Sequence, residues 1–108
     1  MRLEFNKLVR DRIPEIIRLD DGEPETVILS EDAYEKALFE KVVEEAVELQ
    51  EAGSREELLK EIGDVLEVLY AIRDQTGFSD EEIEALRLRR RKDRGAFKKR
   101  IFLKYVDK

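Results

Sequence analysis

Two helix-length segments joined by a very short connection constrain this chain more than any other feature of its sequence. Residues 31–52 follow Ser30, a favourable N-cap, and Gly53 is a natural residue to come after a helix end. The pattern Ser54-x-x-Glu57 is a capping box and predicts a second helix over 55–76. Because the connection is so short, we expect the two helices to be antiparallel neighbours.

Shorter elements are expected on both sides of this hairpin. Pro14 suits the first turn of a helix and predicts a short one ending near Leu19. The pattern Ser79-x-x-Glu82 is a second capping box and opens a helix that should run to about residue 94. Segments 25–29 and 100–106 contain β-branched and aromatic residues and are candidates for short extended pieces, although the C-terminal one could also continue as helix. The predicted fold class is therefore all-α.

The absence of cysteine and histidine removes whole classes of chemistry. Serine–histidine and cysteine–histidine mechanisms are excluded, and so are sulfur and imidazole ligands for a metal. Any bound metal must be held by oxygen, which favours Mg²⁺, Mn²⁺ or Ca²⁺. The length of 108 residues suits a single domain, 1–108, and small helical chains often gain buried apolar area by oligomerising.

The charge of the chain is large and unevenly distributed. Charged residues make up 44% of it, the net charge is −6, and nine lysines and arginines fall within residues 87–100. No apolar run approaches the roughly 18 residues of a membrane span. The first residues also lack the apolar stretch of a signal peptide. We therefore expect a cytoplasmic protein with no membrane partner.

The predicted helices of the hairpin place carboxylates among apolar side chains. At about 100° per residue, Glu45 falls in the same stripe as Leu38 and Leu49, with Glu48 at its edge. Other glutamates of this helix, including Glu44, fall on a face that should be solvated. On the second helix, Glu61 falls inside an apolar arc and Asp64 at its margin; that arc comprises Leu58, Ile62, Val65, Val68, Leu69 and Ile72.

Four carboxylates so placed predict a site for a hard divalent cation. A buried carboxylate without a partner costs several kcal/mol or shifts its pKa. A cation would offset the repulsion among the four, and spacings of i, i+3 aim both members of each pair at one point. The predicted ligands are Glu45, Glu48, Glu61 and Asp64. Glutamate is abundant here, so either pair alone would more often be a solvated face.

These acidic residues resemble a family signature. Lys41-Val-Val-Glu44-Glu45-Ala-Val-Glu48-Leu49, followed by Glu61-Ile-Gly-Asp64, is similar to the E-x-x-E…E-x-x-D pattern of the all-α nucleoside triphosphate pyrophosphohydrolases. That group includes MazG-like enzymes, dimeric dUTPases and phosphoribosyl-ATP pyrophosphohydrolase. The segment Asn6–Ile17 and the pattern Lys92-x-Arg94-Gly95-x-Phe97 resemble a subgroup of small MazG-like proteins.

The resemblance implies a fold and a reaction. The fold would be a MazG-like helical bundle completed in a homodimer or a dimer of dimers. The reaction would be Mg²⁺-dependent hydrolysis of a nucleoside triphosphate between its α and β phosphates, in the role of removing non-canonical nucleotides. An alternative is the phosphoribosyl-ATP pyrophosphohydrolase of histidine biosynthesis, although the segment Asn6–Ile17 argues for a separate role.

Roles for individual residues follow from this reaction. Glu45 is the expected general base, because burial would raise its basicity. Lysine and arginine pair well with phosphate oxygens, so the expected substrate contacts are Lys7, Arg10, Lys41, Lys92 and Arg94.

Two non-enzymatic alternatives remain open. The basic run 87–100 could bind nucleic acid with a steeply salt-dependent affinity. The net charge of −6 and the lack of a known binding motif argue against this. A helical dimer that serves as an inactive interaction module is the other alternative, and the presence of all four acidic residues argues against that one.

Overall fold

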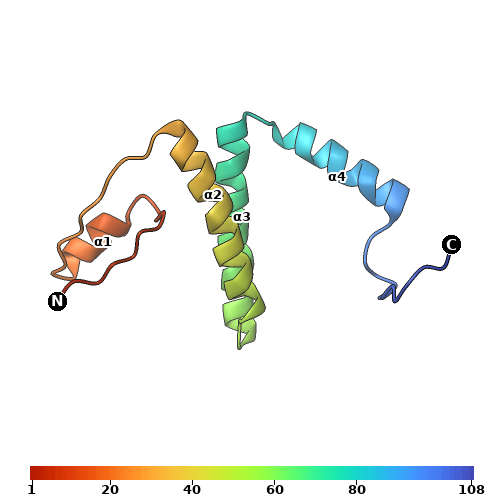
Figure 1. The fold of residues 1–108 in the computed structure, drawn as a ribbon, viewed down its shortest axis with the longest axis horizontal. Coiled ribbons are helices and arrows are strands. Elements are labelled where there is room, and N and C mark those ends of the chain that lie inside the picture. Colours follow the sequence, from red (N-terminus) through yellow and green to blue (C-terminus); the bar gives the residue numbers. More distant parts are fainter. The chain divides into compact units, whose positions relative to one another are not determined.

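The computed structural model describes all 108 residues, and it contains four α-helices and no strand (Figure 1). The helices are α1 (Ile13–Leu19), α2 (Glu31–Gln50), α3 (Arg55–Thr76) and α4 (Asp80–Arg94). The predicted all-α class is confirmed. The chain divides into two compact units, Met1–Thr76 and Gly77–Lys108, which are described separately below.

The helix ends form where capping residues predict them. The Ser30 hydroxyl accepts a hydrogen bond from the amide of Ala33 (3.3 Å). Ser79 and Glu82 form a complete capping box at the start of α4. Gly77 and Gly95 follow the ends of α3 and α4 with φ of 80° and 87°, a backbone region that glycine enters without strain.

The turn of the hairpin differs slightly from its prediction. Helix α2 ends at Gln50 with Glu51 as its C-cap, two residues before the expected end. The amide of Gly53 donates to Glu57 Oε2 (2.8 Å), and the amide of Glu57 donates to the Ser54 hydroxyl (3.1 Å). Half of the predicted capping box is therefore confirmed: Ser54 caps the amide of Glu57 as expected, but the Glu57 carboxylate accepts from Gly53 and not from Ser54.

Helices α2 and α3 lie side by side and form the core of the first unit (Figure 1). Leu38 on α2 and Val68 on α3 are its buried apolar side chains, with 3% and 9% of their surface accessible. The predicted apolar arc of α3 is broader than the buried face, because Leu58, Ile62 and Leu69 are exposed. The hairpin thus leaves part of its apolar surface uncovered.

The remaining segments of the chain are irregular. The N-terminal residues lead through a turn into α1, which ends where the amide of Gly22 donates to the carbonyl of Ile17 (2.8 Å). Segments 25–29 and 100–106 lie outside the helices and form no strand. None of the helices combines the length and apolar character needed to cross a membrane.

Candidate metal centre

Two glutamates of the hairpin each keep one buried oxygen without a hydrogen-bond partner. Glu45 on α2 is only 8% accessible, which confirms its predicted place among apolar residues. The Glu61 side chain on α3 is 12% accessible. Glu45 Oε2 and Glu61 Oε2 are buried and accept no hydrogen bond. Unpartnered carboxylate oxygens are costly in a protein interior, so these two oxygens mark a position suited to a cation.

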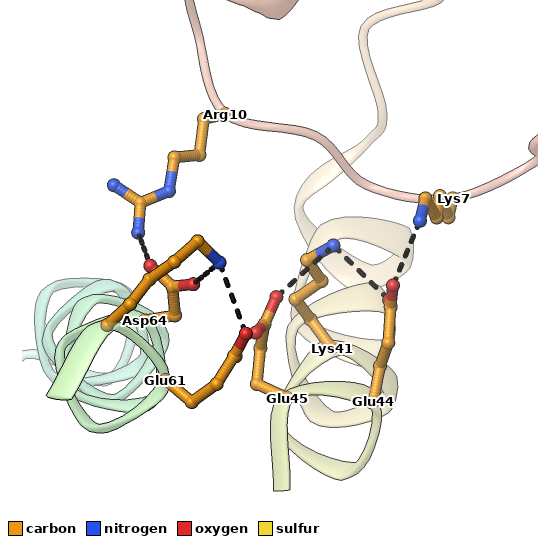
Figure 2. A network of polar contacts seen from close by, with 8 residues as sticks. Lys7, Arg10, Lys41, Glu44, Glu45, Glu61 and Asp64 are labelled. Carbon is orange, nitrogen blue, oxygen red and sulfur yellow. Dashed lines mark hydrogen bonds and ion pairs between the residues drawn. The ribbon is translucent and has the colours of Figure 1, made fainter. Parts of the chain in front are cut away.

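Asp64 completes a three-carboxylate cluster with this pair. Glu45, Glu61 and Asp64 each offer an oxygen, and the three oxygens lie within 4.8 Å of one another. Asp64 is one turn from Glu61 on α3, so the same helical face presents both side chains. Three of the four predicted ligands are therefore brought together across the hairpin (Figure 2).

Glu48 lies beside this cluster and not in it. It is exposed, as its predicted position at the edge of the stripe implies, and it is absent from the set of three converging oxygens. It is still close enough to Glu45 to raise the pKa of that side chain. Its role as a fourth ligand stays a prediction.

The crowding of carboxylates makes Glu45 hard to ionise. Burial is the largest influence that raises its pKa, followed by a hydrogen bond and charge repulsion from Glu48. The nearby Lys41 ammonium opposes this rise, and the charge of Asp64 adds to it. Glu45 is therefore the carboxylate of this site whose charge most needs a compensating cation.

Two lysines supply part of that compensation from within the hairpin. Lys41 Nζ lies 3.2 Å from Glu44 Oε2 and 3.7 Å from Glu45 Oε1. Lys60 Nζ lies 3.1 Å from Glu61 Oε1 and 3.0 Å from Asp64 Oδ2. The hydrogen bonds to Asp64 and Glu61 raise the pKa of Lys60.

Lys60 was not among the residues predicted for the site. Its place in the site could have been predicted from the i, i+4 spacing between Lys60 and Asp64, which places an ammonium and a carboxylate one turn apart on α3. Lys41 was predicted to contact substrate. Its ammonium instead lies on the carboxylates of its own helix, and its contact with substrate stays a prediction.

The N-terminal segment brings two further cations to the site. Lys7 Nζ donates to Glu44 Oε1 (3.0 Å), and Arg10 Nη2 donates to Asp64 Oδ1 (2.8 Å) (Figure 2). Glu44, which we expected to be solvated, has a side chain that is 30% accessible and binds both Lys7 and Lys41. The hydrogen bond from Lys7 is the main cause of its lowered pKa.

The last two predicted substrate contacts belong to the second unit. Lys92 and Arg94 lie in the final turn of α4 and are exposed. Basic side chains in the last turn interact favourably with the negative end of the helix dipole, so their position can be explained without a role in substrate binding. Their contact with substrate stays a prediction.

The chemistry of the site fits a hard divalent cation. All of its converging donors are carboxylate oxygens, the ligand type that Mg²⁺ and Mn²⁺ prefer. The two buried oxygens without a hydrogen bond, on Glu45 and Glu61, are the ones that a bound ion would satisfy. Lys41 and Lys60 reduce the repulsion among the carboxylates but leave these two oxygens unpaired.

Comparison with known proteins identifies a family for this chain. The model of the phosphoribosyl-ATP pyrophosphohydrolase family matches residues 4–91. The chain is 46% identical over 54 residues to an uncharacterized protein of Mycolicibacterium smegmatis, an alignment that covers 50% of this chain and 55% of that protein. The chain thus spans about half the length of that relative. No solved structure matches the chain.

The family match covers most of the chain and includes both helices of the hairpin with all four predicted ligands. Its range extends from the N-terminal segment that carries Lys7 and Arg10 into α4. The chain therefore belongs to the phosphoribosyl-ATP pyrophosphohydrolase family, within the MazG-like superfamily of all-α nucleoside triphosphate pyrophosphohydrolases.

Proposed function

We propose that this chain is a Mg²⁺-dependent nucleotide pyrophosphohydrolase that cleaves between the α and β phosphates of a nucleoside triphosphate. The products would be a nucleoside monophosphate and pyrophosphate, and the biological role would be removal of non-canonical nucleotides in the cytoplasm. The observation that carries this proposal is the convergence of carboxylate oxygens from Glu45, Glu61 and Asp64, two of which residues also keep a buried oxygen without a hydrogen bond. Membership of the family supplies the reaction class.

The proposed metal ligands are the four carboxylates of the hairpin. Glu45 and Glu61 would present their buried free oxygens, Asp64 would add a third ligand, and Glu48 would turn inward from the margin. A bound Mg²⁺, or Mn²⁺ in its place, supplies charge neutralisation for phosphate oxygens and for the leaving pyrophosphate.

Glu45 is the proposed general base. A carboxylate whose pKa is raised by burial is a better proton acceptor than an exposed one. Its side chain would hold the proton removed from the attacking water.

Basic side chains would bind the phosphates. The proposed contacts in the first unit are Lys7, Arg10 and Lys41. Lys92 and Arg94 of the second unit are proposed contacts because of the family resemblance of their motif, and not because of their place in the structure. The first three already bind carboxylates in or beside the cluster, and ammonium and guanidinium groups form strong hydrogen bonds with phosphate oxygens as well.

Hydrolysis of phosphoribosyl-ATP is a second candidate, supported by the description of the matching family. This reaction breaks the same type of bond between α and β phosphates, so the metal centre does not distinguish the two. The choice depends on groups that recognise the base and the added ribose phosphate.

We further propose that a second copy of the chain covers the hairpin's uncovered apolar surface. Each helix of the hairpin has an exposed apolar stripe. The stripe on α2 contains Val43 and Val47, and the stripe on α3 contains Leu59, Ile62 and Leu66. A shallow hollow on α2 includes the first stripe and is lined by Val42, Val43, Ala46, Val47, Leu49 and Gln50. Two identical hairpins could pack these stripes together as a four-helix bundle, the usual closed arrangement for a homodimer.

A hydrolysis assay tests the proposed activity and separates the two substrates. The purified protein is incubated with phosphoribosyl-ATP and with a panel of canonical and modified nucleoside triphosphates, each with Mg²⁺ or with EDTA. Pyrophosphate and the monophosphate product are measured. We expect Mg²⁺-dependent release from at least one modified triphosphate. Release from phosphoribosyl-ATP alone would select the second candidate, and no release from any compound would refute both.

A further inference from the structure

The N-terminal segment spans the two helices that carry the carboxylates. Lys7 binds Glu44 on α2, and Arg10, three residues later, binds Asp64 on α3 (Figure 2). The two contacts tie residues 6–12 to both helices of the hairpin at the level of the cluster. The two basic side chains nevertheless remain about half exposed, so one face of each is open to solvent.

The backbone fixes where this segment turns. Asn6 has φ of 45°, a left-handed conformation that asparagine tolerates better than most residues. The amide of Ile13 donates to the carbonyl of Arg10 (3.0 Å), which makes a turn that runs directly into α1. Arg10 is therefore held at the start of an ordered element and not on a free end.

Arg10 and Lys60 together occupy both oxygens of Asp64. Arg10 binds Oδ1 at 2.8 Å, and Lys60 binds Oδ2 at 3.0 Å. The other two carboxylates of the cluster, Glu45 and Glu61, each keep one oxygen free. A divalent cation that binds Glu45 and Glu61 through these oxygens, and takes Asp64 as its third ligand, competes with the two side-chain cations for the negative charge of Asp64.

Arg10 is the better candidate for displacement. Lys60 binds both Glu61 and Asp64 from the same helix, so it keeps one partner if it loses the other. Arg10 has no second carboxylate partner, and its guanidinium is more than half exposed. Its planar group would then be free beside the cation, where it matches the geometry of a phosphate.

We infer that Arg10 exchanges partners during the working cycle: it neutralises Asp64 in the cation-free site and binds a phosphate of the substrate once a cation has taken Asp64. Lys7 keeps the segment in place through Glu44, which is not a proposed metal ligand. The inference rests on the proposed function, because it takes the cluster to be a metal site and the substrate to be a polyphosphate.

If Arg10 exchanges partners in this way, its removal should have opposite effects on the affinity for the metal ion and on the affinity for a polyphosphate. In the cation-free site Arg10 competes with the metal, so its loss should strengthen metal binding. In the metal-bound site it contacts phosphate, so its loss should weaken polyphosphate binding. A residue that merely supports the fold would weaken both, and an ordinary surface residue would change neither.

Two binding measurements on Arg10→Gln test the inference. The affinity for Mn²⁺ alone is measured by electron paramagnetic resonance, and the affinity for inorganic tripolyphosphate is measured by calorimetry in excess Mg²⁺. We expect Mn²⁺ to bind Arg10→Gln roughly 3- to 10-fold more tightly than wild type, and tripolyphosphate to bind it about 10-fold more weakly or worse. Arg10→Lys should lie between wild type and Arg10→Gln in both measurements.

Arg12→Gln is the matched control. It removes the same charge two residues away, from a side chain that binds Glu15 within α1 (3.1 Å). Both affinities should equal those of wild type. Unchanged or weaker Mn²⁺ binding in Arg10→Gln, or wild-type protein that does not bind tripolyphosphate, would overturn the exchange while leaving the metal site intact. Wild-type protein that binds no Mn²⁺ would overturn the proposed function and the inference with it.

Discussion

Helix α3 keeps Glu61 largely buried, whereas helix α4 leaves every one of its side chains exposed. On α4, Glu84 is neutralised by Arg87 one turn later on the same surface, and that pairing lowers the pKa of Glu84. On the hairpin, Glu45 and Glu61 keep unpaired oxygens although lysines lie beside them. The negative charge of a glutamate is thus neutralised by a neighbouring arginine on α4, whereas on the hairpin the buried glutamate oxygens still lack a partner.

The two units also differ in net charge, which is negative in the first and positive in the second. Residues 1–76 contain 10 lysines and arginines against 21 aspartates and glutamates, a net charge of −11. Residues 77–108 contain 11 against 6, a net charge of +5. Exposed ion pairs contribute little to stability, while buried charges matter in proportion to their desolvation. Substitutions of equivalent charge in the two regions should therefore have very different consequences.

The largest expected difference is in catalysis. Glu45→Gln or Glu61→Gln removes the negative charge of an inner ligand without changing the shape of the side chain much. We expect each to lower pyrophosphate release by roughly 100-fold or more, the scale of losing a catalytic acid–base group. Glu84→Gln on α4 should retain wild-type activity in the same assay. An active Glu45→Gln/Glu61→Gln double variant would show that these carboxylates do not carry the reaction.

A smaller but clear difference is expected in stability without metal. Lys41→Met removes the ammonium that lies beside Glu44 and Glu45, so the buried Glu45 loses its compensating charge. We expect the free energy of unfolding in urea with EDTA to fall by about 1–3 kcal/mol. The control, Arg87→Met on α4, should leave the urea midpoint unchanged. Equal losses in the two variants would contradict the distinction between buried and exposed charge.

The pH dependence of stability should differ in sign between the two regions. The pKa of Glu45 is raised from its ordinary 4.5, so the folded chain holds this proton more readily than the unfolded chain. The contribution of Glu45 to stability therefore falls as pH rises from 4.5 through the raised pKa. The pKa of Glu84 is lowered, so its contribution is present above the ordinary value and is lost as pH falls through the lowered pKa.

Difference curves isolate these two contributions. Unfolding free energies of wild type, Glu45→Gln and Glu84→Gln are measured in EDTA between pH 4 and pH 7. The curve of wild type minus Glu45→Gln should slope downward with rising pH, and the curve of wild type minus Glu84→Gln should slope slightly upward. Slopes of the same sign would mean that Glu45 does not experience the burial described above.

The smallest effect is expected for the α4 ion pair itself. Replacing both Glu84 and Arg87 with glutamine removes one local pair and leaves the net charge unchanged. We expect the thermal unfolding temperature to match that of wild type, because the pair is fully exposed. A clear drop in that temperature would indicate that α4 depends on its surface charges in a way that the hairpin does not.

Local sequence signals determined most of the fold. Capping residues such as Ser30 and Ser79 satisfy free amides at helix starts, so they mark those starts without any tertiary information. The burial of Glu45 followed from its angular position between Leu38 and Leu49. The hairpin followed from its short connection.

The features that could not be predicted from the sequence depend on which face each helix of the hairpin turns toward the other. The helical periodicity of α3 predicted an arc of apolar residues. Which of them are buried depends on packing against α2, which covers Val68 and leaves Ile62 exposed. Long side chains added a second uncertainty. Lys60 and Glu44 reach partners that their backbone positions alone do not specify.

Binding of Mn²⁺ to the protein is the most direct test of the metal centre. Wild-type protein, Glu45→Gln/Glu61→Gln and Glu84→Gln are titrated with Mn²⁺ at neutral pH, with free ion followed by electron paramagnetic resonance. We predict saturable binding to wild type and to Glu84→Gln, and its loss in the double variant. Binding of equal affinity and stoichiometry in all three proteins would contradict a metal centre built on Glu45 and Glu61.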